Sequence, residues 1–213
     1  MTVIDLTHTI SEDMPVYPGT AAPKLTVPCT VERDGFRETL LHMFSHTGTH
    51  VDAPAHLIEK GKTLERFEAS QFVGSALVID CTGLKEGESI DISLVRSYGE
   101  LAEKADFLLF RTDWDSKWGT DAYFGAFPCI TEDVADFIVS SRKKGIGLDL
   151  ISLDPVGSDL PNHRKILSQN TIVIIENLCN LKCVGSALFT LIAAPLKFEN
   201  ADGAPIRALA IID

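Results

Sequence analysis

Hydrophobic positions in this chain fall into short runs separated by turn residues, and most of the runs have the length of a β-strand. The clearest runs are apolar segments bounded by charged residues or glycine, as is typical of buried strands: residues 73–80, 106–111, 146–152 and 171–175. Weaker patterns predict further strands at residues 3–6, 25–31, 36–44, 187–192 and 206–212.

Two segments carry helix signals instead. Ser93 is a predicted N-cap for a helix that runs to about Glu103, with its apolar residues on one face. A second helix is predicted to begin at Thr131, whose hydroxyl can cap it and which is followed by two acidic residues. It is expected to end in the basic residues 142–144 before Gly145.

The predicted strands outnumber the helices by roughly three to one, and helices are interposed only in the middle of the chain. Residues 14–19, 57–67 and 114–128 are expected to form loops. This order favours an α/β domain on a mixed sheet with few helices, with α+β as the alternative. The 213 residues show no repeat and no linker, so residues 1–213 are expected to form a single domain.

Charge and composition narrow the class of protein. Thirty acidic and nineteen basic residues give a net charge of −11, which disfavours nucleic acid and anionic membranes as partners. The longest apolar run, residues 184–196, is too short to span a bilayer, and the N-terminal residues do not resemble a signal peptide. The five cysteines form no zinc or redox pair. We therefore expect a soluble cytoplasmic protein with buried, reduced thiols.

Residues 46–56, His-Thr-Gly-Thr-His-Val-Asp-Ala-Pro-Ala-His, contain three of the six histidines of the chain and one carboxylate. Imidazole and carboxylate are ligands that zinc and manganese prefer. Solvated histidines would be a poor explanation for this density. A helix would place His46 and His50 on one face, but Gly48 and Pro54 disfavour a helix here.

An extended conformation suits the segment better. A turn at Gly48 would bring His46 towards His50, and His50 and Asp52 would then project to the same face of an extended chain. Such a His-His-Asp set leaves coordination positions open, as catalytic sites require. Pro54 would stiffen the exit and present His56 beside the site.

Two distal residues are further candidates. Glu176 ends an apolar run, and buried carboxylates are usually paired or bound to metal. His163 lies in a Pro-Asn-His segment expected to be a loop. For His8 and His42, and for Asp149 and Asp154, structural roles are favoured. The tryptophans of the loop 114–128 could shape a pocket or simply pack.

The central motif, His-x-Gly-Thr-His-x-Asp-x-Pro-x-His, resembles the signature of the cyclase family of metal-dependent hydrolases, whose best-known members are bacterial kynurenine formamidases. Softer similarities to the family extend over nearly the whole chain, at residues 5–10, 15–19, 147–154, 163 and 174–178. The resemblance implies a swivelling β/β/α fold. It also implies a homo-oligomer, a dimer or larger.

The resemblance further implies two metal ions, zinc or manganese. It assigns His46, His50 and Asp52 to the first ion and His163 to the second, with Asp52 and Glu176 bridging the pair. His56 becomes the general acid/base, which agrees with the ability of imidazole to relay protons near neutral pH.

The expected activity is hydrolysis of a small amide, with N-formylkynurenine as the specific substrate and tryptophan catabolism as the setting. Tyr17 is the predicted substrate-binding residue, and it stands where the formamidases typically place a tryptophan. The substrate therefore stays open between N-formylkynurenine and isatin or another cyclic amide, ester or lactone. A metal-binding protein without turnover is the non-enzymatic alternative.

Overall fold

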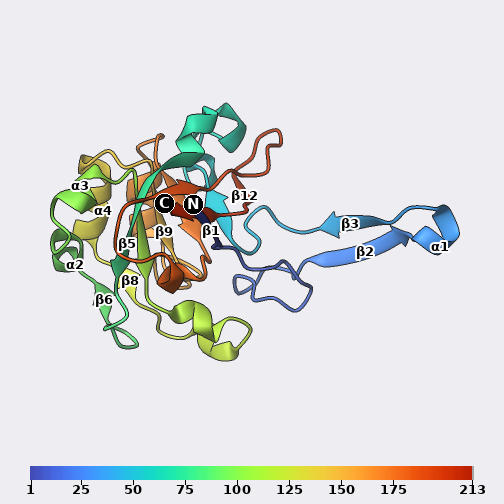
Figure 1. The fold of residues 1–213 in the computed structure, drawn as a ribbon, viewed down its shortest axis with the longest axis horizontal. Coiled ribbons are helices and arrows are strands. Elements are labelled where there is room, and N and C mark those ends of the chain that lie inside the picture. The colour runs from blue at the N-terminus through green and yellow to red at the C-terminus, as the bar shows by residue number, and fades with distance from the viewer. Residues whose placement is uncertain (213) are drawn as a thin grey trace.

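The computed structural model describes residues 1–212, in which a nine-stranded sheet runs through the body of the molecule (Figure 1). The strands are β1 Thr2–Asp5, β2 Lys24–Cys29, β3 Glu38–His42, β4 His50–Asp52, β5 Val73–Asp80, β6 Ser89–Ile90, β7 Phe107–Arg111, β8 Cys129–Ile130, β9 Gly145–Leu148, β10 Val173–Glu176, β11 Phe189–Ile192, β12 Gly203–Pro205 and β13 Leu209–Ile212. The helices are α1 Val31–Asp34, α2 Ile92–Arg96, α3 Glu100–Lys104, α4 Glu132–Ser140 and α5 Pro161–Leu167.

The large sheet has the order β1-β13-β11-β5-β7-β9-β10-β4-β12. Its centre, β5-β7-β9-β10, is parallel, and the strands on both sides of this centre pair antiparallel. The prediction of a mixed α/β single domain with few helices is therefore confirmed. None of the helices in residues 1–212 combines the length and the apolar character that crossing a membrane demands.

Alternating residues of the central strands point into two separate hydrophobic cores, as the period of a strand requires. On β7, Leu108 and Phe110 pack beneath the helices, whereas Phe107 and Leu109 pack on the opposite face. Helices α2–α5 cover the first face (Figure 1). This burial on both faces explains why the central strands read as continuous apolar runs.

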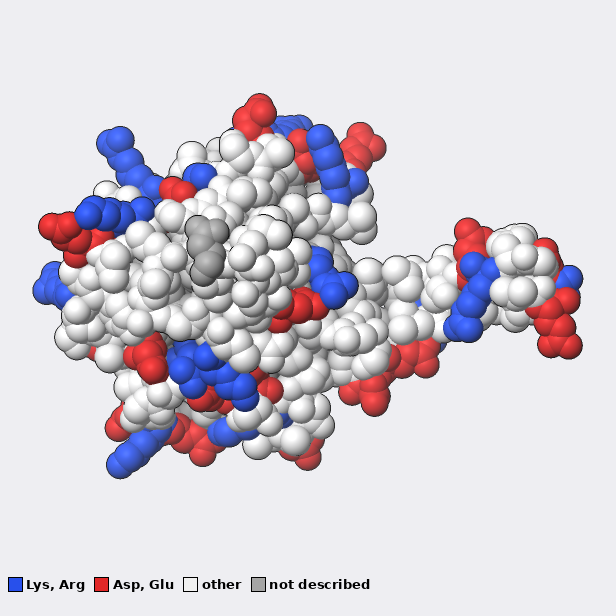
Figure 2. Space-filling view, viewed as in Figure 1, with Lys and Arg blue, Asp and Glu red and all other residues white. Residues whose placement is uncertain are grey.

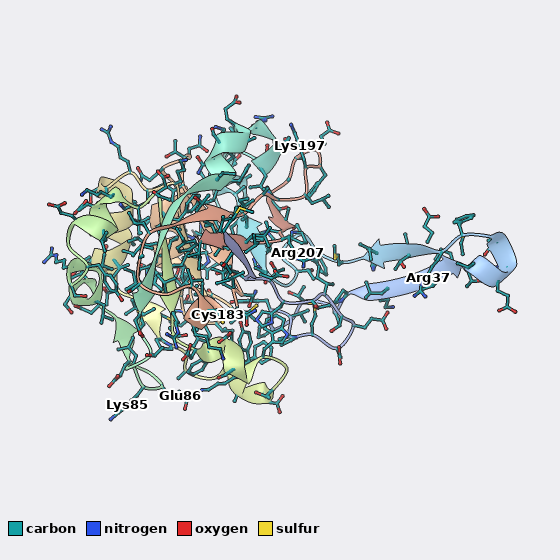
Figure 3. The ribbon with its side chains drawn as sticks, in the orientation of Figure 1. Arg37, Lys85, Glu86, Cys183, Lys197 and Arg207 are labelled. Carbon is teal, nitrogen blue, oxygen red and sulfur yellow. The ribbon has the colours of Figure 1, made fainter. Side chains whose placement is uncertain are left out.

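Residues 24–42, which we call the arm, form a second, two-stranded sheet of β2 and β3 joined through α1. The arm extends far from the body (Figure 1). Every residue of β3 is exposed, and Arg37 lies on the arm, away from the body (Figure 3). The strands predicted at 25–31 and 36–44 are present as the shorter strands β2 and β3, and Val31 begins helix α1 instead of ending the first strand. Their isolation from the main sheet was not anticipated.

Three helix predictions need correction. The helix predicted from Ser93 to Glu103 is two short helices, because Asp91 supplies the N-cap and the chain turns at Gly99, where φ is +51°. Thr131 does precede α4, but its hydroxyl makes no capping bond. That helix ends at Ser140, and a left-handed residue at Arg142 performs the role assigned to Gly145.

The third correction concerns His163, which lies in helix α5 instead of a loop. Pro161 occupies the first turn of this helix, where its missing N–H costs nothing. Helix α5 packs against β10 and α4, so its N-terminal turn lies beside the end of β10. This arrangement brings His163 to Glu176.

Candidate active site

A pocket of about 520 Å³ opens where the chain leaves the carboxyl ends of β9 and β10. Ile151 and Ser152 follow β9 in its lining, and Glu176 and Asn177 belong to the end of β10. This edge is where α/β sheets commonly bind ligands. All seven predicted site residues line the pocket: Tyr17, His46, His50, Asp52, His56, His163 and Glu176.

The turn before β4 has the predicted form. Gly48 adopts a φ of +65°, and its carbonyl accepts hydrogen bonds from His50 Nδ1 (2.8 Å) and Asn177 Nδ2 (2.9 Å). The hydroxyl of Thr49 donates to the carbonyl of Asn177 at 2.6 Å. These bonds tie the histidine segment to the residue that follows β10, so the two halves of the site are held together by side chains that donate to backbone carbonyls.

The first cluster of potential ligands consists of His46, His50 and Asp52. Asp52 Oδ1 lies 2.6 Å from His46 Nδ1 and 3.2 Å from His50 Nε2. His50 and Asp52 project to the same face because they are two residues apart on β4. The three donor atoms converge as the extended reading predicted.

The second cluster consists of Asp52, His163 and Glu176. His163 Nε2 lies 3.0 Å from Glu176 Oε1 and 3.9 Å from Asp52 Oδ2. Glu176 Oε2 faces His50 Nε2 at 3.5 Å. Asp52 and Glu176 therefore each direct one oxygen to the first cluster and the other oxygen to the second. This arrangement is suited to bridging two cations.

Charge in these clusters also fits cation binding. Burial lowers the pKa of His46 and His163, but Asp52 and Asp202 raise that of His46, and Asp154 and Glu176 raise that of His163, to about 10 in each case. Burial and the charge of Asp52 raise the pKa of Glu176. Carboxylates buried this close together need positive charge. Divalent ions would supply it.

His56 lies next to the first cluster, in the short turn Pro54–His56 that follows β4. Its ring is 4.0 Å from that of His46, and its side chain is 30% exposed. Burial lowers the pKa of His56, as do the neighbouring His46 and His163, against the opposite effect of Asp52. Because the His56 ring lies beside that of His46 and its side chain is partly exposed, His56 can reach both the first cluster and the open pocket.

Tyr17 lines the same pocket as the motif residues and is held by a hydrogen bond. Its hydroxyl accepts from the backbone N–H of Gly157 at 3.2 Å. The ring packs against the core beneath the helices while also lining the pocket. It is positioned to contact a bound ligand.

Three further residues support the site, and sequence patterns did not assign them to it. Asp154 accepts from His163 Nδ1 at 2.8 Å, Asp202 lies 3.1 Å from His46 Nε2, and Asn177 holds the Gly48 turn. Asp154 falls in the segment 147–154 that resembles the family, where a structural role was predicted. Asp202 carried no signal, since it immediately precedes β12, a strand that was not predicted.

The remaining candidates lie elsewhere. His8 stacks on Trp118 at 3.8 Å, and His42 is exposed on the arm. Neither tryptophan of the loop 114–128 lines the pocket. Asp149 accepts from the backbone N–H groups of residues 112 and 113, as a structural role predicts.

The cysteine prediction is partly wrong. All five cysteines are free thiols. Cys81 and Cys179 are buried and Cys183 is exposed, so not every thiol is protected by the core. Cys179 and Cys183 share no helix, because the chain between them forms only a short 3₁₀ turn.

Comparison with known proteins gives consistent matches. A family model named Cyclase, with the description "Putative cyclase", matches residues 4–155. A kynurenine formamidase of Bacillus cytotoxicus is 30% identical over 97% of this chain and 95% of its own length.

Two solved structures are similar over nearly their whole length. Isatin hydrolase A from Labrenzia aggregata, bound to benzyl benzoate, superposes with a TM-score of 0.87 at 26% identity, over 98% of this chain and 93% of that one. A protein described as a "predicted metal-dependent hydrolase" from Bacillus stearothermophilus gives a TM-score of 0.80 at 30% identity, over 98% and 97% of the two chains.

Proposed function

Because this chain belongs to the cyclase family, we propose that it is a metal-dependent hydrolase of a small non-peptide amide, with N-formylkynurenine as the substrate and formate and kynurenine as the products. The single observation that carries the proposal is the convergence of five donor residues on two adjoining clusters, which share Asp52, in a pocket that also holds His56. The curated relatives named kynurenine formamidase support the choice of substrate.

In this proposal His46, His50, Asp52, His163 and Glu176 hold the metal. Two divalent ions, zinc or manganese, would polarise the substrate carbonyl and lower the pKa of water. Water adds to the formyl carbon, the C–N bond breaks, and the amine leaves as kynurenine. His56 takes a proton from the water and returns it to the departing nitrogen. Its place beside the first cluster suits it to both transfers.

The rest of the pocket would bind and orient the substrate. Tyr17 offers an aromatic face to the substrate ring, and Leu57 and Ile151 line the same pocket. The volume of about 520 Å³ is in the range of small-molecule sites. The free thiols are compatible with a reducing cytoplasm. We place the protein there, in tryptophan catabolism.

A second candidate substrate is isatin, whose cyclic amide could be opened by the same groups. The similarity to isatin hydrolase A favours this candidate, and Tyr17 at a position where formamidases typically place tryptophan also leaves room for it. A protein that binds metal without turnover is the remaining alternative, and the place of His56 argues against it.

The substrate is tested by assaying the metal-loaded protein with N-formylkynurenine and isatin side by side. We expect the higher kcat/KM with N-formylkynurenine. Tyr17→Trp should lower KM for that substrate while leaving kcat within about twofold, because the larger ring adds contacts remote from the reacting carbon. A higher kcat/KM with isatin would make isatin the substrate in place of N-formylkynurenine. Turnover of neither compound would favour a protein that only binds metal.

We also propose that the chain is a homodimer joined through the arm. An isolated two-stranded ribbon is at best marginally stable in water. This one exposes five large apolar residues within or next to it: Val31, Phe36, Leu40, Leu41 and Phe44. Figure 2 shows few charged side chains along the arm between the body and its charged tip. A second copy of the chain would cover this apolar surface.

Placing charge on the arm should therefore separate the copies. Leu40→Glu together with Leu41→Glu is expected to convert a dimer into a monomer, as measured by light scattering coupled to gel filtration. Val73→Glu, another exposed apolar position on the body, is the matched control and should leave the mass unchanged. A double variant that stays dimeric would exclude the arm from the interface.

A further inference from the structure

Asp202 lies between the two histidines to which the proposed function gives different roles. Its Oδ2 is 3.1 Å from His46 Nε2 and 3.9 Å from His56 Nδ1. The carboxylate is 44% exposed and lines the pocket. It therefore faces one proposed metal ligand and the proposed acid/base at the same time.

The sheet fixes Asp202 in this place. Its carbonyl accepts from the N–H of Ala53 at 2.9 Å, and the next residue, Gly203, pairs with Asp52 across β12 and β4. The imidazole of His46 lies directly against Gly203, where an added Cβ would come within 2.6 Å of Nε2. Glycine at 203 thus lets His46 approach β12 closely enough to meet Asp202.

The two nitrogens of His46 have separate partners. Nδ1 faces Asp52 in the first cluster, so Nε2 is the nitrogen left to carry a proton. The other clustered histidines follow the same rule. His50 directs Nδ1 to the carbonyl of Gly48, and His163 directs Nδ1 to Asp154. Histidines that bind metal usually donate their other N–H to such a partner, which fixes the tautomer and the ring orientation.

We propose that Asp202 is a positioning residue that acts through both histidines. It accepts the Nε2 proton of His46, which leaves Nδ1 free for metal. It also attracts the Nδ1 side of His56, which turns the opposite ring nitrogen towards the substrate. The inference rests on the proposed function, because it takes His46 as a ligand and His56 as the group that moves protons.

Metal affinity tests the first half of the proposal without any substrate. Asp202→Ala should weaken zinc binding, measured by competition with a chromophoric chelator, by about 10- to 100-fold. Asp202→Asn should weaken it less, since an amide oxygen still accepts one hydrogen bond. Asp121→Asn, at an exposed position outside the pocket lining, should bind zinc like the unmodified protein.

Kinetics with saturating metal test the second half. Asp202→Ala should lower kcat by about tenfold with little change in KM. In a His56→Ala background the same substitution should change kcat no further but still weaken zinc binding.

Zinc affinity of Asp202→Ala within twofold of the unmodified protein, or a kcat effect that persists without His56, would overturn the proposal. Loss of a whole zinc equivalent would make Asp202 a ligand and would also overturn it. A protein that turns over neither substrate but shows the affinity change would instead contradict only the proposed function.

Discussion

Replacing His56 with alanine is expected to lower kcat for amide hydrolysis by a factor of about 10²–10⁴ while the metal stays bound. The imidazole lies beside the first cluster but outside the donor atoms of His46, His50 and Asp52. Its removal should therefore leave those donors in place. The departing amine would then have to take its proton from bulk water, which slows C–N cleavage.

Measuring both the rate of product formation and the metal content of one preparation distinguishes a histidine that transfers protons from a histidine that binds metal. His42→Ala is a suitable control, because it removes an imidazole that does not line the pocket. Unchanged kcat in His56→Ala would exclude His56 from proton transfer. Loss of metal together with activity would make it a ligand.

The half of the site that could be predicted from the sequence is the half whose residues lie close together along the chain. His46, His50, Asp52 and His56 occupy eleven residues, so one turn at Gly48 and one short strand determine their arrangement. Gly48 and Pro54 exclude a helix on elementary grounds. Little tertiary information is needed to expect three converging donors there.

The distal half depends on tertiary structure, and prediction from the residues was correspondingly weaker. Glu176 was recognisable as an acid at the end of an apolar strand. His163, however, reaches it only because α5 packs on β10, and that helix was not expected. Asp202 immediately precedes a three-residue strand at the sheet edge, and that strand is too short to leave a hydrophobic pattern.

The arm illustrates a different limit of sequence patterns. Residues 36–44 suit a pleated surface, and the strand was predicted correctly. Apolar residues such as Leu40 and Leu41 normally face a core. In the structure they are 61% and 54% exposed. An apolar strand shows that a surface is to be covered, without showing whether the same chain or a second copy covers it.

Removing the carboxylate of Asp52 should have the largest effect on the metal centre. Asp52 Oδ1 serves the first cluster and Oδ2 faces the second, so its loss weakens both. The charge stabilisation that metal ions provide in such reactions is several kcal/mol, and each 1.36 kcal/mol is a factor of ten in rate. Asp52→Ala is therefore expected to lower kcat/KM by about 10³-fold or more and to reduce bound metal below one equivalent.

Chelation should reproduce the effect reversibly in the unmodified protein. Dialysis against a strong chelator should abolish hydrolysis, and zinc or manganese should restore it. Binding to the native state alone also stabilises the fold, by about 4 kcal/mol when free metal is a thousandfold above Kd. The melting temperature should therefore fall on chelation. In Asp52→Ala it should respond far less to added zinc, because two of the donor atoms are missing. Full activity in metal-free protein, or an Asp52→Ala variant that binds two equivalents, would contradict the metal centre, since this carboxylate is shared by both clusters.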